Sequence, residues 1–260
     1  MSAAGLVTGA SSGIGLELAG CLAADGHDVV LVARRRDRLE DVGRELARRY
    51  GVRWWAIAAD LANPAAPGEI VRQLQSFGVS VDLLVNNAGF GALGPLATLD
   101  PETLGRMLEV NVVALTRLTR LLLPGMLERR SGRILNVAST AGFVPGPLMA
   151  VYYASKAYVI SLSEALAEEL RGSGVTVTVL CPGPTRTEFQ EVAGMQATRL
   201  FKMPGVMDAA AVAQRGYAGL KAGRRIVIPG PLNRALPFAI RFAPRTLVAR
   251  VAKIFQERVR

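Results

Sequence analysis

The stretch Leu6-Val7-Thr8-Gly9-Ala10-Ser11-Ser12-Gly13-Ile14-Gly15 decides the fold, because it passes from an apolar run through a glycine-rich turn into a helical pattern at residues 16–23. Glycines at positions 9, 13 and 15 allow another molecule to approach the backbone closely. The free N–H groups and positive dipole end of the following helix favour a pyrophosphate. A tight strand-to-helix connection would explain the glycines as well, but the order strand, turn, helix favours a dinucleotide-binding site.

A second informative stretch is Val151-Tyr152-Tyr153-Ala154-Ser155-Lys156, which precedes a strongly apolar helical pattern. Tyr152 and Lys156 stand four residues apart, so one turn of helix places phenol and ammonium on the same face. A nearby ammonium favours the phenolate, and we expect it to lower the pKa of the phenol from about 10 toward the range in which acid–base catalysis operates. Alone the pair carries little weight, because a solvated surface pair is the common alternative.

Taken together, the motifs of the chain resemble those of the classical short-chain dehydrogenases/reductases over about residues 3–230. They follow in the family's order, as residues 8–15, 60–61 and 86–89, then Asn111, Ser139, Tyr152 and Lys156, then residues 182–187. The separation of Ser139 from Tyr152 (152 − 139 = 13) is the usual one in the family. The spacing Gly-x-x-x-Gly-x-Gly and the chain length disfavour the extended family members that act as epimerases or dehydratases.

The resemblance implies a catalytic tetrad of Asn111, Ser139, Tyr152 and Lys156. Tyr152 would donate a proton to a carbonyl oxygen as hydride arrives from nicotinamide, and Ser139 would hydrogen-bond the developing oxyanion. Lys156 would lower the pKa of Tyr152 and hold the nicotinamide ribose, and Asn111 would hold a water that joins Lys156 to a proton relay. Without the resemblance, Asn111 is an amphipathic boundary residue and Ser139 an ordinary serine at a strand end.

The expected cofactor-binding residues lie in the same motifs and at the end of the second strand. They are Gly9, Ser11, Ser12, Gly13, Ile14, Gly15, Arg34, Arg35, Asp60, Leu61, Asn87, Ala88, Gly89, Tyr152, Lys156, Pro182, Gly183, Thr185 and Thr187. By resemblance, Asp60 and Leu61 contact adenine, and Thr187 contacts the nicotinamide carboxamide. No metal site is expected.

The end of the second strand predicts which nucleotide binds. Folds selective for NAD place an acid there for the ribose hydroxyls, whereas a 2′-phosphate requires that acid to be absent and an arginine to be near. Ala33 stands at the acid's position and Arg34 follows it. An arginine cluster is otherwise a solvated helix start, but positive charge opposes the dipole at a helix N-terminus, which hints at an anionic ligand. We therefore expect NADP(H), and by analogy with the family the direction of carbonyl reduction.

The rest of the pattern predicts an α/β fold. Strands are expected near residues 4–8, 28–33, 52–58, 81–86, 132–138, 175–181 and 225–229, and helices near 13–24, 37–49, 66–76, 102–129, 153–171 and 208–222. Near-continuous apolar strands that alternate with helices indicate a single doubly wound, Rossmann-type domain, with a mostly parallel seven-stranded sheet covered on both faces. Ligands bind beyond the carboxyl ends of such strands, so the motifs are expected to share one rim.

Length and composition agree with one domain. The chain has 260 residues, 50% of them hydrophobic, and we expect a catalytic domain over 1–230 with a basic amphipathic extension of it over 231–260. Gly, Pro or charge interrupts each apolar run before the roughly 18–20 residues that span a bilayer. The absence of a basic leader before the glycine turn, and Cys21 and Cys181 as buried thiols, favour the reducing cytoplasm.

Positive charge is concentrated after residue 196. Residues 1–196 hold 18 Lys/Arg and 19 Asp/Glu, whereas residues 197–260 hold 13 and 2. A helical pattern over 244–260 gathers apolar residues on one side and basic residues off it. The apolar side consists of Leu247, Val248, Val251, Ile254, Phe255 and Val259. Such a helix suits peripheral contact with an anionic membrane, and docking onto the domain or a neighbouring subunit is the alternative. An anionic, acyl-bearing substrate is a third explanation; nucleic acid is disfavoured, since no recognition motif is present.

The sequence gives the least information about the substrate. Residues 188–207 follow the Pro-Gly segment and are expected to cap a greasy, adaptable pocket with Phe189, Met195, Leu200, Phe201, Met203 and Met207. We expect a reductase of lipophilic ketones or oxoacyl chains that forms a homo-oligomer, a dimer or tetramer. The alternative is a cofactor-binding regulatory protein on the same fold, which would have no need of the tetrad. Tyr153 and Tyr158 are expected to be packing residues.

Overall fold

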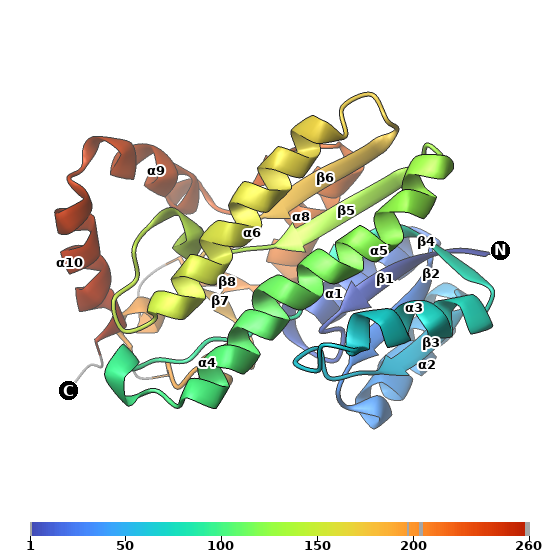
Figure 1. Cartoon of the computed structure of the whole chain (residues 1–260), viewed down its shortest axis with the longest axis horizontal. Helices are drawn as coiled ribbons and strands as arrows, with labels where there is room; N and C mark the ends of the chain where they lie inside the picture. The colour runs from blue at the N-terminus through green and yellow to red at the C-terminus, as the bar shows by residue number, and fades with distance from the viewer. Residues whose placement is uncertain (1, 197, 203–204, 258–260) are drawn as a thin grey trace.

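A seven-stranded sheet forms the centre of the molecule in the computed structural model, which describes residues 2–196, 198–202 and 205–257 (Figure 1). All of its neighbouring strands pair in parallel, in the order β3-β2-β1-β4-β5-β6-β9. The bounds are β1 (Ser2–Thr8), β2 (Asp28–Ala33), β3 (Trp54–Ala58), β4 (Val79–Asn86), β5 (Gly132–Val137), β6 (Val175–Leu180) and β9 (Ile226–Val227). The predicted doubly wound fold is confirmed, and the strand order reverses between β1 and β4.

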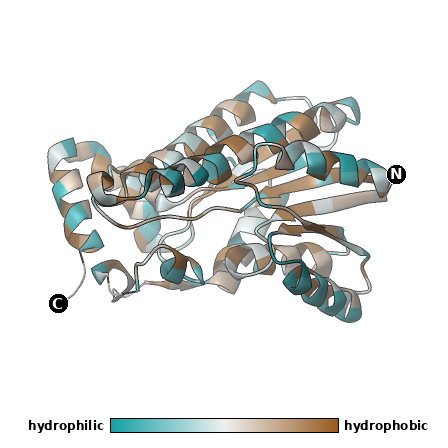
Figure 2. Ribbon diagram, turned by 60° about the horizontal axis from the view of Figure 1, so that its bottom comes forward, coloured by the Kyte–Doolittle hydropathy of each residue, from teal (hydrophilic) through white to brown (hydrophobic). Residues whose placement is uncertain are grey.

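Helices cover both faces of this sheet. One face carries α1 (Gly13–Ala24), α2 (Arg36–Tyr50) and α8 (Ala209–Lys221), and the other carries α3 (Ala66–Ser76), α5 (Leu115–Glu128) and α6 (Ala150–Glu169). Successive strand residues point to opposite faces, so Val7 packs with α1 and α8 while Leu6 packs with α3 and α5. Figure 2 shows hydrophobic residues on the strands and on the helix sides that face them.

A continuous helix of three parts follows β4. It consists of α4 (Pro101–Leu108), the π-helical segment η2 (Glu109–Ala114) and α5, with Pro124 inside α5. By length and composition alone this helix could cross a membrane. As expected, Arg117, Arg120 and Pro124 interrupt its apolar run. The helix continues through those residues and packs Ala114, Leu118 and Met126 against the sheet.

Short elements close the carboxyl-end rim of the sheet. They are η1 (Leu96–Thr98), η3 (Thr140–Phe143), β7 (Thr185–Arg186), α7 (Phe189–Val192), η4 (Arg199–Lys202) and β8 (Met207–Asp208). After β9 the chain forms α9 (Pro231–Ala239), η5 (Ile240–Phe242) and α10 (Arg245–Gln256), which stand at one end of the molecule in Figure 1. Helix α9 was not predicted, because Pro231 and Pro237 mask its pattern. The helix expected over 244–260 is α10, and residues 258–260, with Val259 among them, lie outside the described part.

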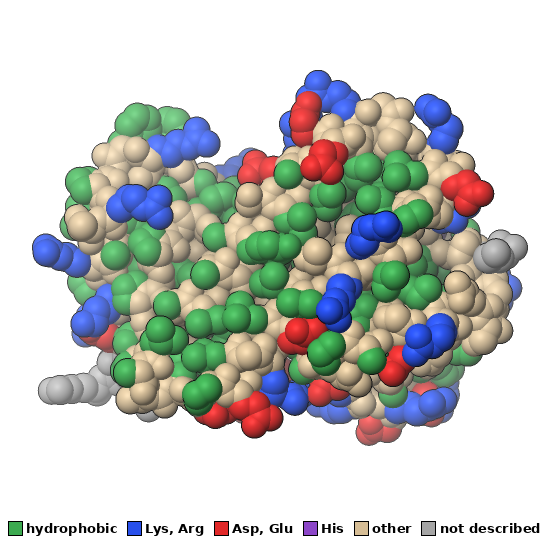
Figure 3. Space-filling view, in the orientation of Figure 1, with side chains coloured by type: hydrophobic (Ala, Val, Ile, Leu, Met, Phe, Trp, Pro, Cys, Tyr) green, Lys and Arg blue, Asp and Glu red, His purple; other side chains and the backbone are tan. Residues whose placement is uncertain are grey.

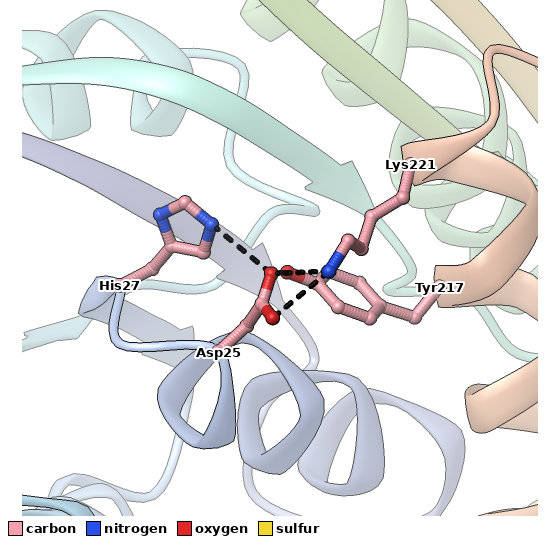
Figure 4. Close-up of polar contacts among 4 residues, drawn as sticks. All are labelled: Asp25, His27, Tyr217 and Lys221. Atoms are coloured by element: carbon pink, nitrogen blue, oxygen red, sulfur yellow. Dashed lines mark hydrogen bonds and ion pairs between the residues drawn. The ribbon is translucent and has the colours of Figure 1, made fainter.

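The far end of α1 is tied to α8 by a polar cluster (Figure 4). The Asp25 carboxylate accepts hydrogen bonds from the Tyr217 hydroxyl at 2.9 Å and from Lys221 Nζ at 2.8 Å, and His27 Nε2 lies 3.8 Å away. The bonds from Lys221 and Tyr217 lower the pKa of Asp25. Since α1 is a rigid rod about 18 Å long, holding this end fixes the direction of the glycine turn at its other end.

Candidate active site

A cavity of about 890 Å³ opens at the carboxyl ends of the strands, and segments that follow β1 to β6 line it. Of the residues that the sequence assigns to the cofactor or to catalysis, two do not line the cavity, Gly15 and Asn111. The structure therefore brings the motifs together at one rim, on both sides of the point where the strand order reverses. This is the position at which doubly wound folds bind ligands.

Steric contact beneath the glycine turn explains the position of Gly15. A Cβ atom on Gly15 would lie 2.2 Å from the Gly9 carbonyl oxygen and 2.3 Å from Asn87 Nδ2, distances that no side chain tolerates. Gly9 and Gly13 have φ angles of 67° and 55°, in the region that favours glycine. Gly15 thus lets the turn close on itself, whereas Gly9 and Gly13 present their backbone to the cavity.

Thr8, which the sequence analysis did not single out, joins the turn to the end of β4. Its hydroxyl oxygen accepts hydrogen bonds from the backbone N–H groups of Asn87 and Ala88, both at 3.0 Å. Asn87 Nδ2 in turn donates to the Thr8 carbonyl at 2.9 Å. Asn87 lines the cavity and at the same time supports the turn from below. The position of Thr8, at the end of a strand and directly before a glycine turn, was the feature of the sequence that could have indicated this supporting role.

Tyr152, Ser139 and Lys156 converge on the cavity from α6 and from the end of β5. The Ser139 hydroxyl hydrogen-bonds Tyr152 and also donates to the Pro182 carbonyl at 3.3 Å. Lys156 Nζ lies 5.7 Å from the centre of the Tyr152 ring and donates to the Val137 carbonyl at 2.9 Å. The four-residue spacing predicted that Tyr152 and Lys156 share one face of a helix. The fold brings Ser139, at the end of β5, next to that face.

Burial governs the protonation of this pair. It raises the pKa of Tyr152 above its usual value, and the hydrogen bond between Tyr152 and Ser139 opposes that rise only in part. Burial also lowers the pKa of Lys156 to about 8. The expected lowering of the Tyr152 pKa by Lys156 is therefore not found among these residues, because desolvation in one dry pocket disfavours phenolate and ammonium alike.

Asn111 lies one layer behind the cavity wall, in the π-helical segment η2, and is 1% exposed. Its amide clasps the Phe90 backbone, accepting from the N–H and donating to the carbonyl, both at 3.0 Å. Its Nδ2 also donates to Ser155 Oγ at 3.1 Å. A Cβ atom on Gly89 would lie 3.1 Å from Asn111 Oδ1 and 3.3 Å from Lys156 Nζ, so Gly89 keeps the space between them open.

Charged side chains surround the part of the cavity next to β2 and β3. Arg35 donates to Ser11 Oγ at 3.4 Å and pairs with Glu188 at 3.1 Å. The Asp60 carboxylate pairs with Arg106 at 2.9 Å, and the hydrogen bonds and charge around it lower its pKa despite partial burial. Arg34 lines the cavity and forms no ion pair with any acid in the described part of the chain.

The Pro-Gly segment after β6 closes over the glycine turn. The Pro182 carbonyl accepts from Thr140 N at 2.9 Å, which joins this segment to the end of β5. A Cβ atom on Gly13 would lie 3.1 Å from the methyl group of Thr187, so Thr187 lies directly against the turn. The Thr185 hydroxyl donates to the Gly183 carbonyl at 2.9 Å and orders the loop between them.

Comparison with known proteins agrees with this geometry. The family model of the short chain dehydrogenases matches residues 4–197. The chain belongs to the short-chain dehydrogenase family. A very-long-chain 3-oxoacyl-CoA reductase of Anas platyrhynchos is 36% identical over 191 residues, which make up 72% of this chain and 61% of that protein. The chain thus matches about three fifths of the length of such curated relatives.

Two solved structures of similar proteins hold a nicotinamide nucleotide. A short-chain dehydrogenase from Sphingobium yanoikuyae, in complex with NADPH, is 32% identical with a TM-score of 0.81, over 94% of this chain and 97% of the other. A short-chain dehydrogenase/reductase from Burkholderia phymatum, in complex with NAD, is 29% identical with a TM-score of 0.81, over 91% and 92%. The family relationship therefore supports a nicotinamide dinucleotide as the ligand. Whether that nucleotide carries a 2′-phosphate depends on the residues around Arg34.

In this short-chain dehydrogenase the expected cap is found in part. Phe189, Met195 and Leu200 line the cavity, and the Phe189 ring lies 5.2 Å from the Tyr152 ring, centre to centre. Met207 does not line it, because it pairs with Thr185 in the small β7–β8 sheet and packs on the main core. Met203 and the side chain of Phe201 lie outside the described part.

The C-terminal helices supply the outer wall of the cavity. From the sequence, three explanations were open for the basic segment that contains them. The lining residues from α9 to α10 are Leu236, Ala239, Ile240, Ala243, Leu247, Val248, Val251, Ala252, Phe255 and Gln256. Most of the apolar side of α10 thus faces its own domain, as the docking alternative predicts. Leu247, Val251 and Ile254 are 52%, 43% and 46% exposed, and of these three only Ile254 does not line the cavity.

A buried hydrogen bond attaches α10 to the helix that carries Tyr152. Gln256, 1% exposed, donates through Nε2 to the hydroxyl of Tyr153. Its Oε1 atom is buried and has no hydrogen-bond partner within the described residues. Tyr153 is therefore the packing residue that was expected. Tyr158, expected to be another, is instead 41% exposed, with its hydroxyl 3.1 Å from that of Thr116.

Replacement of Gln256 by leucine should destabilise the protein. The change leaves the Tyr153 hydroxyl buried without its partner, which costs about 1–3 kcal/mol of the free energy of unfolding. Urea unfolding checks this, with Lys253→Ala as the control on the exposed side of the same helix, where a change below about 0.5 kcal/mol is expected. Equal effects of the two substitutions would contradict the attachment of α10 through this bond.

Proposed function

We propose that the chain is an NADP(H)-dependent oxidoreductase that reduces a lipophilic ketone or oxoacyl substrate. The observation that carries the proposal is that Tyr152, Ser139 and Lys156 meet in the same cavity as the glycine turn. A proton donor, an oxyanion donor and a nucleotide-binding backbone then serve one reacting group. The site is suited to hydride transfer with proton transfer, since it combines these three groups in one cavity. Among the described lining residues, no serine or cysteine stands beside a histidine, the usual pair for nucleophilic catalysis.

The backbone around the turn fits a dinucleotide. The pyrophosphate would lie against Gly9, Ser12 and Gly13, where side chains are short and no side chain caps the N-terminus of α1. The Gly9 N–H already donates to the Val32 carbonyl at 2.8 Å, so the N–H groups offered to the phosphates would be those of the first turn of α1. Asp60 and Leu61 line the part of the cavity where adenine is expected, and Thr187 lines the part where nicotinamide is expected. When bound, the nicotinamide supplies the hydride, and the protein supplies its position and the proton.

The raised pKa of Tyr152 keeps its hydroxyl protonated at neutral pH, which is the form that donates a proton to a carbonyl oxygen. Ser139 would hydrogen-bond the same oxygen as negative charge builds on it. Lys156 stands close enough to stabilise the phenolate that remains, and it would hold the ribose hydroxyls of the cofactor. Asn111, whose clasp on Phe90 shapes the wall behind Lys156, would order the water through which the proton is replaced.

The surroundings of Arg34 support a 2′-phosphate. Arg34 borders the cavity and forms no ion pair with a described acid, although its charge helps to lower the pKa of Asp60. Ala33 leaves space where an acid would repel the phosphate. Arg35 and Ser11, which hydrogen-bond each other, stand next to it and could contact the same group.

The walls of the cavity support a lipophilic substrate. Side chains of Phe189, Met195 and Leu200 meet those of α9 and α10 across the cavity, and the relatives named 3-oxoacyl-CoA reductases agree with an oxoacyl chain. The free Oε1 of Gln256 would accept a hydrogen bond from a polar group of such a substrate. A homo-oligomeric state and a cytoplasmic location stay predictions of the sequence.

A cofactor-binding regulator on the same fold is the second candidate, since a fold does not fix a function. A regulator has no need of Asn111, Ser139, Tyr152 and Lys156 together. Turnover of NADPH with a panel of aliphatic, aromatic and acyl-thioester carbonyls distinguishes the two. Binding of NADPH without turnover of any carbonyl would favour the regulator.

Tyr152→Phe should remove turnover while NADPH binding stays within a few-fold, because the hydroxyl acts in the transition state and the ring remains. The expected loss is about 10²–10⁴-fold in kcat. Tyr158→Phe, the same change on the exposed side of α6, should leave kcat unaltered. Activity above about a tenth in Tyr152→Phe would contradict the role of this hydroxyl.

The pair of changes Ala33→Asp and Arg34→Leu should shift preference from NADPH toward NADH. The new carboxylate repels a 2′-phosphate and accepts hydrogen bonds from the ribose hydroxyls. The quantity to measure is the ratio of kcat/KM for the two nucleotides, with Arg38→Leu as a control from the same arginine cluster. An unchanged ratio would assign the phosphate to Ser11 and Arg35 instead.

Reduction should become slower as the pH rises above about 8. Below that pH Lys156 carries its proton and stabilises the Tyr152 phenolate, and above it the charge is lost, because its pKa is about 8. Measurement of kcat/KM for NADPH-dependent reduction between about pH 6 and 10 checks this direction. A profile that stays flat through this range would show that the charge of Lys156 is not required.

A further inference from the structure

The outward side of α9 and η5 exposes large hydrophobic side chains. Phe238 and Phe242 are 66% and 77% exposed, and their rings pack edge to face with centres 5.3 Å apart. Leu232, nearer the start of α9, is 72% exposed. We call these three residues, with the arginines described below, the apolar tip. Exposed hydrophobic groups gathered in this way indicate an interaction site.

The substrate cavity does not account for the apolar tip. The cavity is lined by Leu236, Ala239 and Ile240 of the same segment, whereas Phe238 and Phe242 do not line it. The two phenylalanines are four residues apart and so share one side of the segment. This part of the chain is therefore apolar on two sides, and only the inner side has a partner in the described structure.

The charged residues of the segment that carries the apolar tip are all positive. Residues 226–256 contain five Lys or Arg and no Asp or Glu. Arg234, Arg241 and Arg245, which flank the phenylalanines in the chain, are exposed and form no ion pair with a described acid. Figure 3 shows hydrophobic side chains at the upper left, over α9 and the turn to α10, with basic side chains beside them.

We propose that the apolar tip, formed by Leu232, Phe238 and Phe242 with Arg234, Arg241 and Arg245, docks onto the surface of an anionic lipid bilayer. Aromatic rings enter the boundary between headgroups and acyl chains, and the arginines meet anionic headgroups. A segment with five basic residues and no acid over residues 226–256 complements such a surface. This assignment moves the lipid contact from the apolar side of α10, which faces the cavity, to the outer side of α9 and η5.

Docking in this way would bring the cavity wall to the membrane. Leu236 and Ile240 of the wall precede Phe238 and Phe242 by only two positions in the chain, so a lipophilic substrate could pass from bilayer to cavity without crossing bulk water. This consequence rests on the proposed function. The docking itself does not, and vesicle binding tests it without turnover.

The test is sedimentation of the full chain with vesicles of phosphatidylcholine, with or without about one third phosphatidylserine. The protein should sediment with the anionic vesicles at low salt, several-fold less at about 0.5 M salt, and less with phosphatidylcholine alone. Protein that stays in the supernatant with anionic vesicles at low salt would overturn the proposal.

Two sets of substitutions assign the binding to the tip. The double variant Phe238→Ser/Phe242→Ser should bind anionic vesicles at least about tenfold more weakly, whereas Phe77→Ser, at a 40% exposed phenylalanine after α3, should bind like the unaltered protein. The variant Arg241→Gln/Arg245→Gln keeps the rings and should lose about fivefold for each arginine, from the typical strength of one basic residue at an anionic surface.

Gel filtration and turnover of a small water-soluble ketone accompany these measurements. Both should be unaltered in the phenylalanine and arginine variants, which shows that the fold and the chemistry remain. Equal sedimentation of the phenylalanine variant and the unaltered protein would overturn the proposal. So would loss of an oligomer without loss of vesicle binding, because the apolar tip would then be a contact between subunits. If the phenylalanine variant fails to fold, the arginine variant decides, and undiminished binding by it overturns the proposal.

Discussion

The close contact between the glycine turn and the end of β4 is the constraint on which the rest of the site depends. Gly15 approaches the Gly9 carbonyl and the Asn87 amide more closely than any side chain allows, and the Thr8 hydroxyl binds two backbone N–H groups of the neighbouring segment. These contacts hold β1 and β4 together where the strand order reverses. They also set the direction in which α1 leaves the sheet, and the Asp25 cluster fixes its other end.

A second constraint is the burial of two ionisable groups in one pocket. Tyr152 and Lys156 are each pushed toward their neutral form, which keeps the phenol able to donate a proton and brings the lysine near its titration range. The hydrogen bond from Lys156 to the Val137 carbonyl and the clasp of Asn111 on Phe90 satisfy polar groups that burial would otherwise leave without partners. The chemistry of the site and the stability of its wall thus rest on the same contacts.

Much of the fold could be predicted from the sequence, because near-continuous apolar strands and helical patterns alternate from residue 4 to residue 227. The cofactor motifs could be located for the same reason, since each follows its strand. Local patterns could not predict α9, whose prolines hide its helical period, or the bond between Tyr153 and Gln256, which are 103 residues apart. The pKa of Tyr152 was predicted in the wrong direction, because spacing reveals the nearby lysine and says nothing of the dry surroundings that outweigh it.

The attachment of α10 to Tyr153 has a consequence for the order in which the protein is assembled. The segments that line the nucleotide site are complete by residue 187 and the α8 partners of Asp25 by residue 221, whereas the outer wall comes from residues 236–256. During synthesis the nucleotide pocket can therefore form before the outer wall of the cavity exists, and that wall is complete only when α10 reaches Tyr153. Nucleotide bound at that early stage would favour the folded sheet before its hydrophobic wall exists, and would shorten the time for which the greasy interior is exposed to other newly made chains.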